Sequence, residues 1–198
     1  MDRNQLIQKC EASIRWLDHH IDDLSVPNKL RTRLAGGCLD QALEHQKAIV
    51  LLVANQLHGS AFAIMRMLLE AYVRGIWLNR CATDSELERI SNGGGLKSFG
   101  KLVEAIDKLE GFEATLFTQI KEQSWTIMNG FIHTGLEQIS RRNTEKTIEP
   151  NHDEDEILKA LNFSAGIGWL AAIEICHVAQ NDKLAATILE KMKESFAV

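Results

Sequence analysis

The stretch Ser60–Leu78, SAFAIMRMLLEAYVRGIWL, is apolar on nearly every side when it is read as a helix. A helix of this kind must be covered by other elements, because almost its whole surface avoids water. Apolar residues also recur at helical spacing before and after this stretch, and no alternating pattern typical of a strand is present. The sequence therefore predicts an all-α fold in which neighbouring helices surround a central helix over about 60–80.

The composition predicts one domain of ordinary size. The chain has 198 residues, of which 45% are hydrophobic and 25% are charged, and it contains 2 prolines. A chain of this length can bury a core of its own, and the scarcity of proline permits long helices. We therefore expect a single domain over residues 1–198, a bundle of about six to eight helices.

The expected helices are separated by recognisable breaks. Val26-Pro27 ends the first helix, because a residue before proline is pushed out of helical geometry. Gly36-Gly37 is a weak point in the second helix, where we expect a bend or a close helix crossing. The triple glycine at 93–95 predicts a loop over 92–96, and a polar linker is expected at about 141–153. Helices are expected over 3–24, 28–57, 60–80, 98–109, 112–134, 154–180 and 182–196, with one more beginning at Thr83 or Asp84.

Charge and cysteine usage restrict the class of protein. The net charge of −5 gives no overall attraction for a polyanion, so any contact with nucleic acid must be local. The four cysteines are widely separated, without a C-x-x-C motif, and neither a secretory leader nor an apolar run of the ~18 residues of a membrane span is evident. We interpret the cysteines as reduced thiols in a soluble, cytoplasmic protein.

Three charged residues interrupt the central apolar helix. Arg66, Glu70 and Arg74 follow one another at a spacing of four, which places them on one face. A buried, unpaired charge is costly, so we expect these side chains to pair with one another or with other polar groups, or to open into a cleft. A structural ion-pair ladder and a functional cleft are both compatible with this pattern.

A second polar pair lies in the stretch Trp125–Gly135, WTIMNGFIHTG. Asn129 and His133 share one helical face, Gly130 permits close approach to the backbone between them, and Gly135 ends the helix. A histidine at a helix C-terminus gains proton affinity from the helix dipole, which suits a general acid or base near neutral pH. The alternative is a hydrogen-bonded core histidine beside Phe131 and Ile132.

The sequence MNGFIH at 128–133 resembles the R-N-x-x-x-H signature of the HEPN superfamily. Members of this superfamily are all-helical proteins of prokaryotic defence, toxin-antitoxin and abortive-infection systems, and many are metal-independent ribonucleases that act as dimers. The run MRMLLEAYVRGIWL at 65–78 is similar to the arginine-x-x-x-glutamate helix of HEPN-like families, which packs beside the histidine-bearing helix. The resemblance implies a homodimer, an RNA substrate, and an antitoxin or other protein partner.

One position departs from this signature. Met128 stands where the family has an arginine that holds the scissile phosphate, and methionine cannot make that contact. Of the motif, Asn129 and His133 carry over. We expect Arg66 or Arg74 to supply the missing cation if the two helices pack together, and Arg141 and Arg142 to form a basic, substrate-binding patch beyond the glycine stop.

Two functional hypotheses follow from the resemblance and the departure. In a ribonuclease, His133 acts as acid or base, Asn129 positions the phosphate, Arg66 stabilises its developing charge and Glu70 holds Arg66. In a degenerate relative, the same polar cluster is structural, and the protein acts by binding a partner or its own copy.

Other chemistries have weaker support in the sequence. A helical di-metal site normally needs two Glu-x-x-His helices, and only Glu174 and His177 are suitably spaced on an expected helix. Cys176 and His177 are neighbours whose side chains diverge on a helix, which argues against a cysteine nucleophile. The triple glycine lacks the lysine and preceding strand of a phosphate loop. We therefore expect neither a metal nor a cofactor.

Overall fold

The computed structural model describes residues 1–110, 117–120, 122, 128, 130–131 and 135–196. Within these residues the protein is helical and has no strand; the nearest approach to one is an isolated antiparallel bridge between Asn143 and Ile148. The predicted fold class, an all-α single-domain bundle, is confirmed. The named helices are α1 (Arg3–Ile21), α2 (Leu30–Ala54), α3 (His58–Arg80), α4 (Asp84–Ser91), α5 (Phe99–Ile106), α7 (Leu136–Ser140), α8 (Glu154–Val178) and α9 (Asp182–Phe196).

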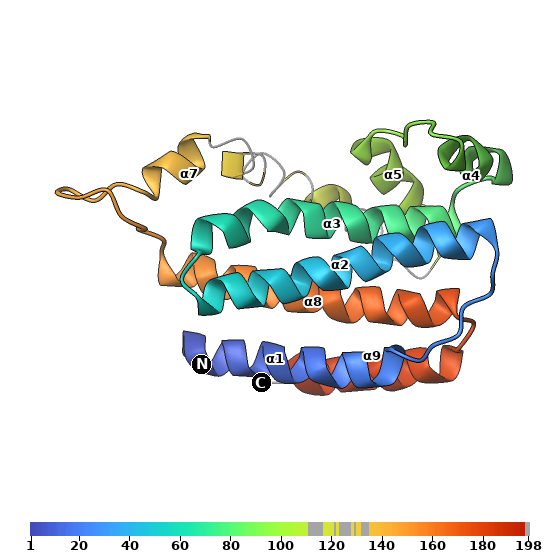
Figure 1. The fold of residues 1–198 in the computed structure, drawn as a ribbon, viewed down its shortest axis with the longest axis horizontal. Helices are drawn as coiled ribbons and strands as arrows, with labels where there is room; N and C mark the ends of the chain where they lie inside the picture. Colours follow the sequence, from blue (N-terminus) through green and yellow to red (C-terminus); the bar gives the residue numbers. More distant parts are fainter. Residues whose placement is uncertain (111–116, 121, 123–127, 129, 132–134, 197–198) are drawn as a thin grey trace.

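The helices are stacked in layers (Figure 1). α1 and α9 form the lowest layer, α2 and α8 lie above them, and α3 lies against both α2 and α8. On the opposite side of α3, α5 packs against it, while α7 lies near its N-terminal end and α4 near its C-terminal end, and the three short helices form an outer layer. α3 is therefore enclosed by neighbours, as its apolar surface predicts.

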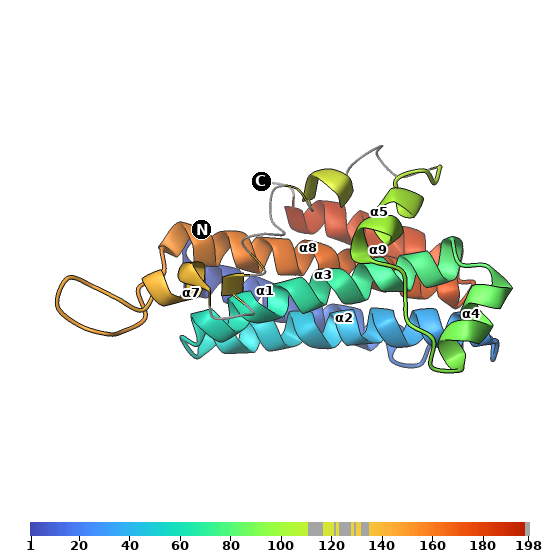
Figure 2. The same ribbon diagram turned by 90° about the horizontal axis from the view of Figure 1, so that it is seen from above.

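α3 and α8 run in the same direction, which determines the path of the chain between them. α3 begins at the end of the bundle where α2 turns back, and it finishes at the opposite end, whereas α8 begins again at the first end (Figures 1 and 2). The connection over residues 81–153 must therefore return along the full length of α3. This return crossing forms the outer layer.

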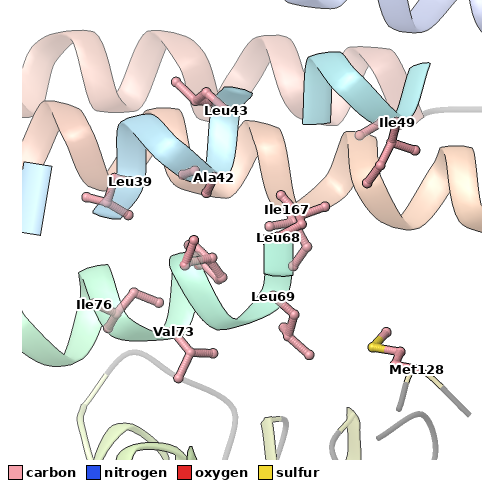
Figure 3. Packing of buried hydrophobic residues seen from close by; sticks show 14 of the residues in the cluster. Leu39, Ala42, Leu43, Ile49, Leu68, Leu69, Val73, Ile76, Met128 and Ile167 are labelled. Carbon is pink, nitrogen blue, oxygen red and sulfur yellow. The ribbon is translucent and has the colours of Figure 1, made fainter. Parts of the chain in front are cut away.

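The core on α3 has two sides (Figure 3). Leu68 points toward Ile167 of α8 and the side chains of α2, while Leu69 and Val73 point to the opposite side of α3, the side on which Met128 lies. All of these side chains are buried. α3 is thus apolar all round because the bundle covers one side and the return crossing covers the other.

Helix beginnings follow the capping chemistry of the sequence. Thr83 caps α4, and its side chain accepts from the backbone N–H of Glu86 while the Glu86 carboxylate accepts from the Thr83 backbone. Asp153 caps α8, whose first turn is acidic and so opposes the positive end of the helix dipole. Both predicted starting points are confirmed.

The close helix crossings occur at glycines other than those expected. α2 is continuous through Gly36 and Gly37, and a Cβ at either would meet no atom within 4 Å, so the predicted crossing there is wrong. α2 instead presses Leu39 against Gly75 of α3 and Gln46 against Gly168 of α8. A Cβ at Gly75 would lie 2.6 Å from Leu39 Cγ, and one at Gly168 would lie 2.7 Å from Gln46 Nε2.

The breaks between helices lie close to the expected positions. Residues 92–98 connect α4 to α5, with Gly93 at a φ of 86°, and residues 141–153 form the loop before α8. Part of the expected helix 112–134 falls outside the described residues. α7, over Leu136–Ser140, was not predicted, because five residues are too few to display a helical period.

Two further findings concern thiols and membrane character. Cys10, Cys38, Cys81 and Cys176 are all free, and burial raises the pKa of Cys10 and of Cys176 to about 11. In the described part of the chain, one helix, α8, is long and apolar enough to cross a membrane, but most of it is buried in the bundle, which is typical of a core helix.

Candidate functional site

The charged face of α3 forms the ladder that its spacing predicts. Arg66 Nε donates to Glu70 Oε1 at 2.7 Å, and Arg74 donates to the other carboxylate oxygen. Glu70 is the least exposed of the three, at 15%, whereas Arg74 is 40% exposed. Glu70 therefore fixes two arginines along one edge of α3, and Arg74 reaches solvent most readily.

Two described aromatic residues before α7 contact α3 in reverse order along the helix. Phe117 lies 6.0 Å from Tyr72 between ring centroids, near the C-terminal half of α3. Phe131 stacks on Phe62, near its N-terminal end, at 4.8 Å. Asp107, at the end of α5, accepts hydrogen bonds from the backbone of Phe117 and Thr118 and so anchors the start of this segment.

Asn129 and His133, the predicted catalytic pair, lie outside the described residues. Of the described residues close to them in the sequence, Met128 is 5% exposed and belongs to the core, and Phe131 is buried against Phe62. Met128 is therefore turned into the protein.

Of the two arginines predicted beyond the glycine stop, one is held by the protein. Arg141 Nε donates to Glu156 Oε2 at 2.8 Å, a second nitrogen donates to Oε1, and its guanidinium lies over the Phe131 ring at 5.2 Å from the centroid. This contact lowers the pKa of Glu156. Arg142 is exposed. The two side chains thus lie in different environments, one over the aromatic cluster and the other in solvent.

Two histidines meet beneath the loop that precedes α8. His58, at the start of α3, and His152 make an edge-to-face contact at 5.6 Å, and His152 stacks on Phe62 at 5.3 Å. Their Nδ1 atoms are buried and have no hydrogen-bond partner among the described residues. Burial lowers the pKa of both histidines. Arg3 lowers the pKa of His58 further, and His58 lowers the pKa of His152 further. Both shifts favour the neutral form of the ring.

The one motif that resembled a di-metal ligand pair is used otherwise. Glu174 is buried and accepts two hydrogen bonds from Arg80, at 2.7 and 2.6 Å, and one from Asn79 at 2.9 Å. His177 instead pairs with Asp182. Across the described ranges no group of three or more His, Cys, Asp or Glu side chains is placed to hold a metal ion.

Sequence reasoning missed His58, His152 and the Arg80–Glu174 pair. Each unites residues far apart in the chain: Arg80 and Glu174 are separated by 94 positions. A charged residue on an apolar helix was a usable signal for Glu174, because such a group needs a partner. No comparable signal marked His152, which lies in a polar stretch that reads as a loop.

Comparison with known proteins identifies a family. The profile of a family of unknown function, DUF6988, matches residues 39–198. The match includes most of α2, all of α3, the return crossing, α8 and α9. No curated protein and no solved structure matches the chain. Because the matched region spans most of the sequence, the chain belongs to the DUF6988 family.

Proposed function

We propose that this protein is a HEPN-like helical protein that acts on RNA in stress or phage defence. The observation that carries the proposal is the placement of two described aromatic residues on α3: Phe117 lies against Tyr72 in its C-terminal half, and Phe131 stacks on Phe62 near its N-terminal end. Met128 and Phe131, which are described residues of the stretch, thus lie against the half of α3 that carries Arg66. The resemblance implies the same neighbouring arrangement of an arginine-x-x-x-glutamate helix and a histidine-bearing helix.

The proposed chemistry is metal-independent RNA cleavage. His133 acts as the acid or base on the 2′-hydroxyl or the leaving oxygen, Asn129 positions the phosphate, and Arg66 stabilises its developing charge. Glu70 is a positioning residue, a role supported by its 2.7 Å hydrogen bond from Arg66. Arg74 and Arg142 attract the RNA backbone. The protein acts in the cytoplasm as a homodimer, with an antitoxin or other protein as its regulatory partner.

A specific observation favours a second candidate function. Met128 is buried, and it stands where the HEPN signature has a phosphate-binding arginine. The Arg66–Glu70–Arg74 ladder is satisfied within α3. These features fit a non-catalytic HEPN-like protein whose polar cluster is structural. Such a protein acts by binding a partner protein or a second copy of itself.

An assay of cell growth and RNA integrity separates the two functions. Cells express the wild type, His133→Ala or Arg66→Ala, with His19→Ala and Arg15→Ala as matched controls, because both control residues are exposed on α1. Thermal melts followed by circular dichroism are recorded for each purified protein. Catalysis predicts that the wild type and both controls arrest growth and degrade RNA, while the two folded site variants do not.

The structural alternative predicts a different pattern. An inert wild type, together with melting temperatures that fall in Arg66→Ala and His133→Ala and stay constant in the controls, would overturn catalysis. The oligomeric state of the same samples, measured by light scattering, then tests binding to a second copy.

A further inference from the structure

An apolar pocket of about 290 Å³ opens between α3, α8 and the segment that contains Met128. This volume is close to the lower end of the range for small-molecule sites, roughly 300–1,000 Å³. Thioether and aromatic groups dominate its walls and can close around a flat ring, because methionine adapts its shape and sulfur contacts aromatic rings favourably. The apolar walls are formed by Phe62, Met65, Met128, Phe131, Ala160 and Phe163.

The charged residues that line the pocket leave its interior suited to an uncharged group. Arg141 and Glu156 line the pocket as an ion pair, and each offsets the charge of the other. Lys159 also lines it, and its side chain is 78% exposed, with Asp155 as a partner at 3.1 Å on an exposed helix turn. An exposed pair of this kind is weak and easily exchanged. The site therefore suits a neutral ring inside the pocket and a negative charge that remains in water near Lys159.

The pocket lies near one of the candidate catalytic residues, Arg66. Phe62, which lines the pocket, is four residues before Arg66 on α3, so the two side chains share one face of the helix. When a phosphate of an RNA strand lies at Arg66, the group next to that phosphate can therefore reach the pocket. In single-stranded RNA the adjacent group is an unpaired base, which is flat, uncharged and able to stack on aromatic side chains.

We infer that this pocket binds a nucleobase ring, presented by unpaired RNA, and that it is a base subsite near Arg66. The inference deepens the proposed RNA-directed function and rests on it. Phe163, on α8, is a wall of the subsite and does not belong to the proposed catalytic group. Lys159 attracts the phosphate that leads into the pocket.

Binding is measured with short single-stranded 2′-O-methyl RNA, which cannot be cleaved through the 2′-hydroxyl. A second oligomer carries the same backbone without bases. Base–aromatic stacking is worth about 1–3 kcal/mol per base, so the abasic oligomer is expected to bind the wild type about 5- to 150-fold more weakly. Equal affinity for the two oligomers overturns the base subsite and leaves the RNA-directed function standing.

Variants of the pocket residues test whether the preference for the base-bearing oligomer arises in this pocket. Phe163→Ala, which removes a wall, and Ala160→Phe, which fills the space, are expected to abolish the preference for the base-bearing oligomer. Phe196→Ala, on α9, is the matched control and should retain it. Lys159→Gln should weaken the binding of both oligomers alike. Lys183→Gln, at an exposed position of α9, should weaken the binding of neither. A preference that survives in a folded Phe163→Ala or Ala160→Phe protein overturns the assignment.

Free small molecules test whether the group that enters the pocket comes from RNA or from another ligand. A free nucleoside that binds in a Phe163-dependent manner, while no RNA binds, supports a nucleobase pocket and overturns the RNA-directed function. Decanoate that binds where neither RNA nor nucleoside does overturns the nucleobase assignment in favour of an acyl site.

Discussion

At the scale of single residues, Glu174 is the charge on which the described core depends most. Its carboxylate is buried and its two oxygens are satisfied by Arg80 and Asn79. Removal of one partner from a buried ion pair typically costs about 3–5 kcal/mol, because the other charge is left without compensation.

We expect Glu174→Ala to lower the free energy of unfolding by about 2–4 kcal/mol, since Arg80 is partly exposed and water can solvate its guanidinium. Urea denaturation followed by circular dichroism measures this loss. Glu190→Ala on α9 is the control, because Glu190 pairs with Lys193 in solvent. If both variants lose equal stability, the buried pair does not have this role.

His58 and His152 predict a pH dependence of stability. Their pKa values are lowered in the folded protein, whereas histidines of the unfolded chain titrate near about 6.5. Below that pH the unfolded chain binds protons that the folded protein does not bind, so the free energy of unfolding falls as the pH falls. Above about pH 6.5 the two histidines make their full contribution to the free energy of unfolding.

Urea denaturation between about pH 7 and pH 5.5 tests this dependence. His152→Phe, which keeps a ring on Phe62, should reduce the decline, and the exposed control His19→Phe should not. An identical decline in all three proteins would exclude the His58–His152 pair as its source.

At the scale of elements, two glycines set how closely α2 approaches its neighbours. A Cβ at Gly168 would clash with the amide of Gln46, which is 1% exposed. Overpacking of a core typically costs about 1–3 kcal/mol, so we expect Gly168→Ala to be destabilising by that amount. Gly166 of the same helix has open space around it, and Gly166→Ala should stabilise by about 0.5–1 kcal/mol through helix propensity.

Thermal melts of the two glycine variants give opposite signs if this packing is correct. A higher melting temperature for Gly168→Ala than for the wild type would show that α2 and α8 can separate at little cost.

The elements also show what sequence could and could not predict. α3 and α8 were predictable because long apolar periods mark both of them locally, and Asp153 also marks the start of α8. The pairing of Arg66, Glu70 and Arg74 followed from spacing on one helix. The contacts of Gly75, Gly168 and Glu174 were not predictable, because each depends on a partner in another helix. The same limit applies to the pocket, whose walls come from three separate stretches.

At the scale of the whole molecule, the long helices and the outer layer differ in burial. α2, α3 and α8 contribute most of the fully buried side chains, whereas α4 contributes Leu87 alone. Local opening is easiest where few apolar contacts are buried. We therefore expect backbone amides of α2, α3 and α8 to exchange most slowly with deuterium and those of α4 and α7 to exchange fastest, as measured by mass spectrometry of peptides. Equal protection of α4 and α2 would contradict a separate outer layer.

The parallel course of α3 and α8 has a consequence for protein engineering. A minimal core without residues 81–153 would need a linker that spans the whole of α3, whose 23 residues extend about 35 Å at ~1.5 Å per residue. At about 3.3 Å per extended residue, that linker needs at least about 11 residues. It would also uncover Leu69 and Val73, so this face would have to be redesigned with polar residues before the shortened protein could remain in solution as a monomer.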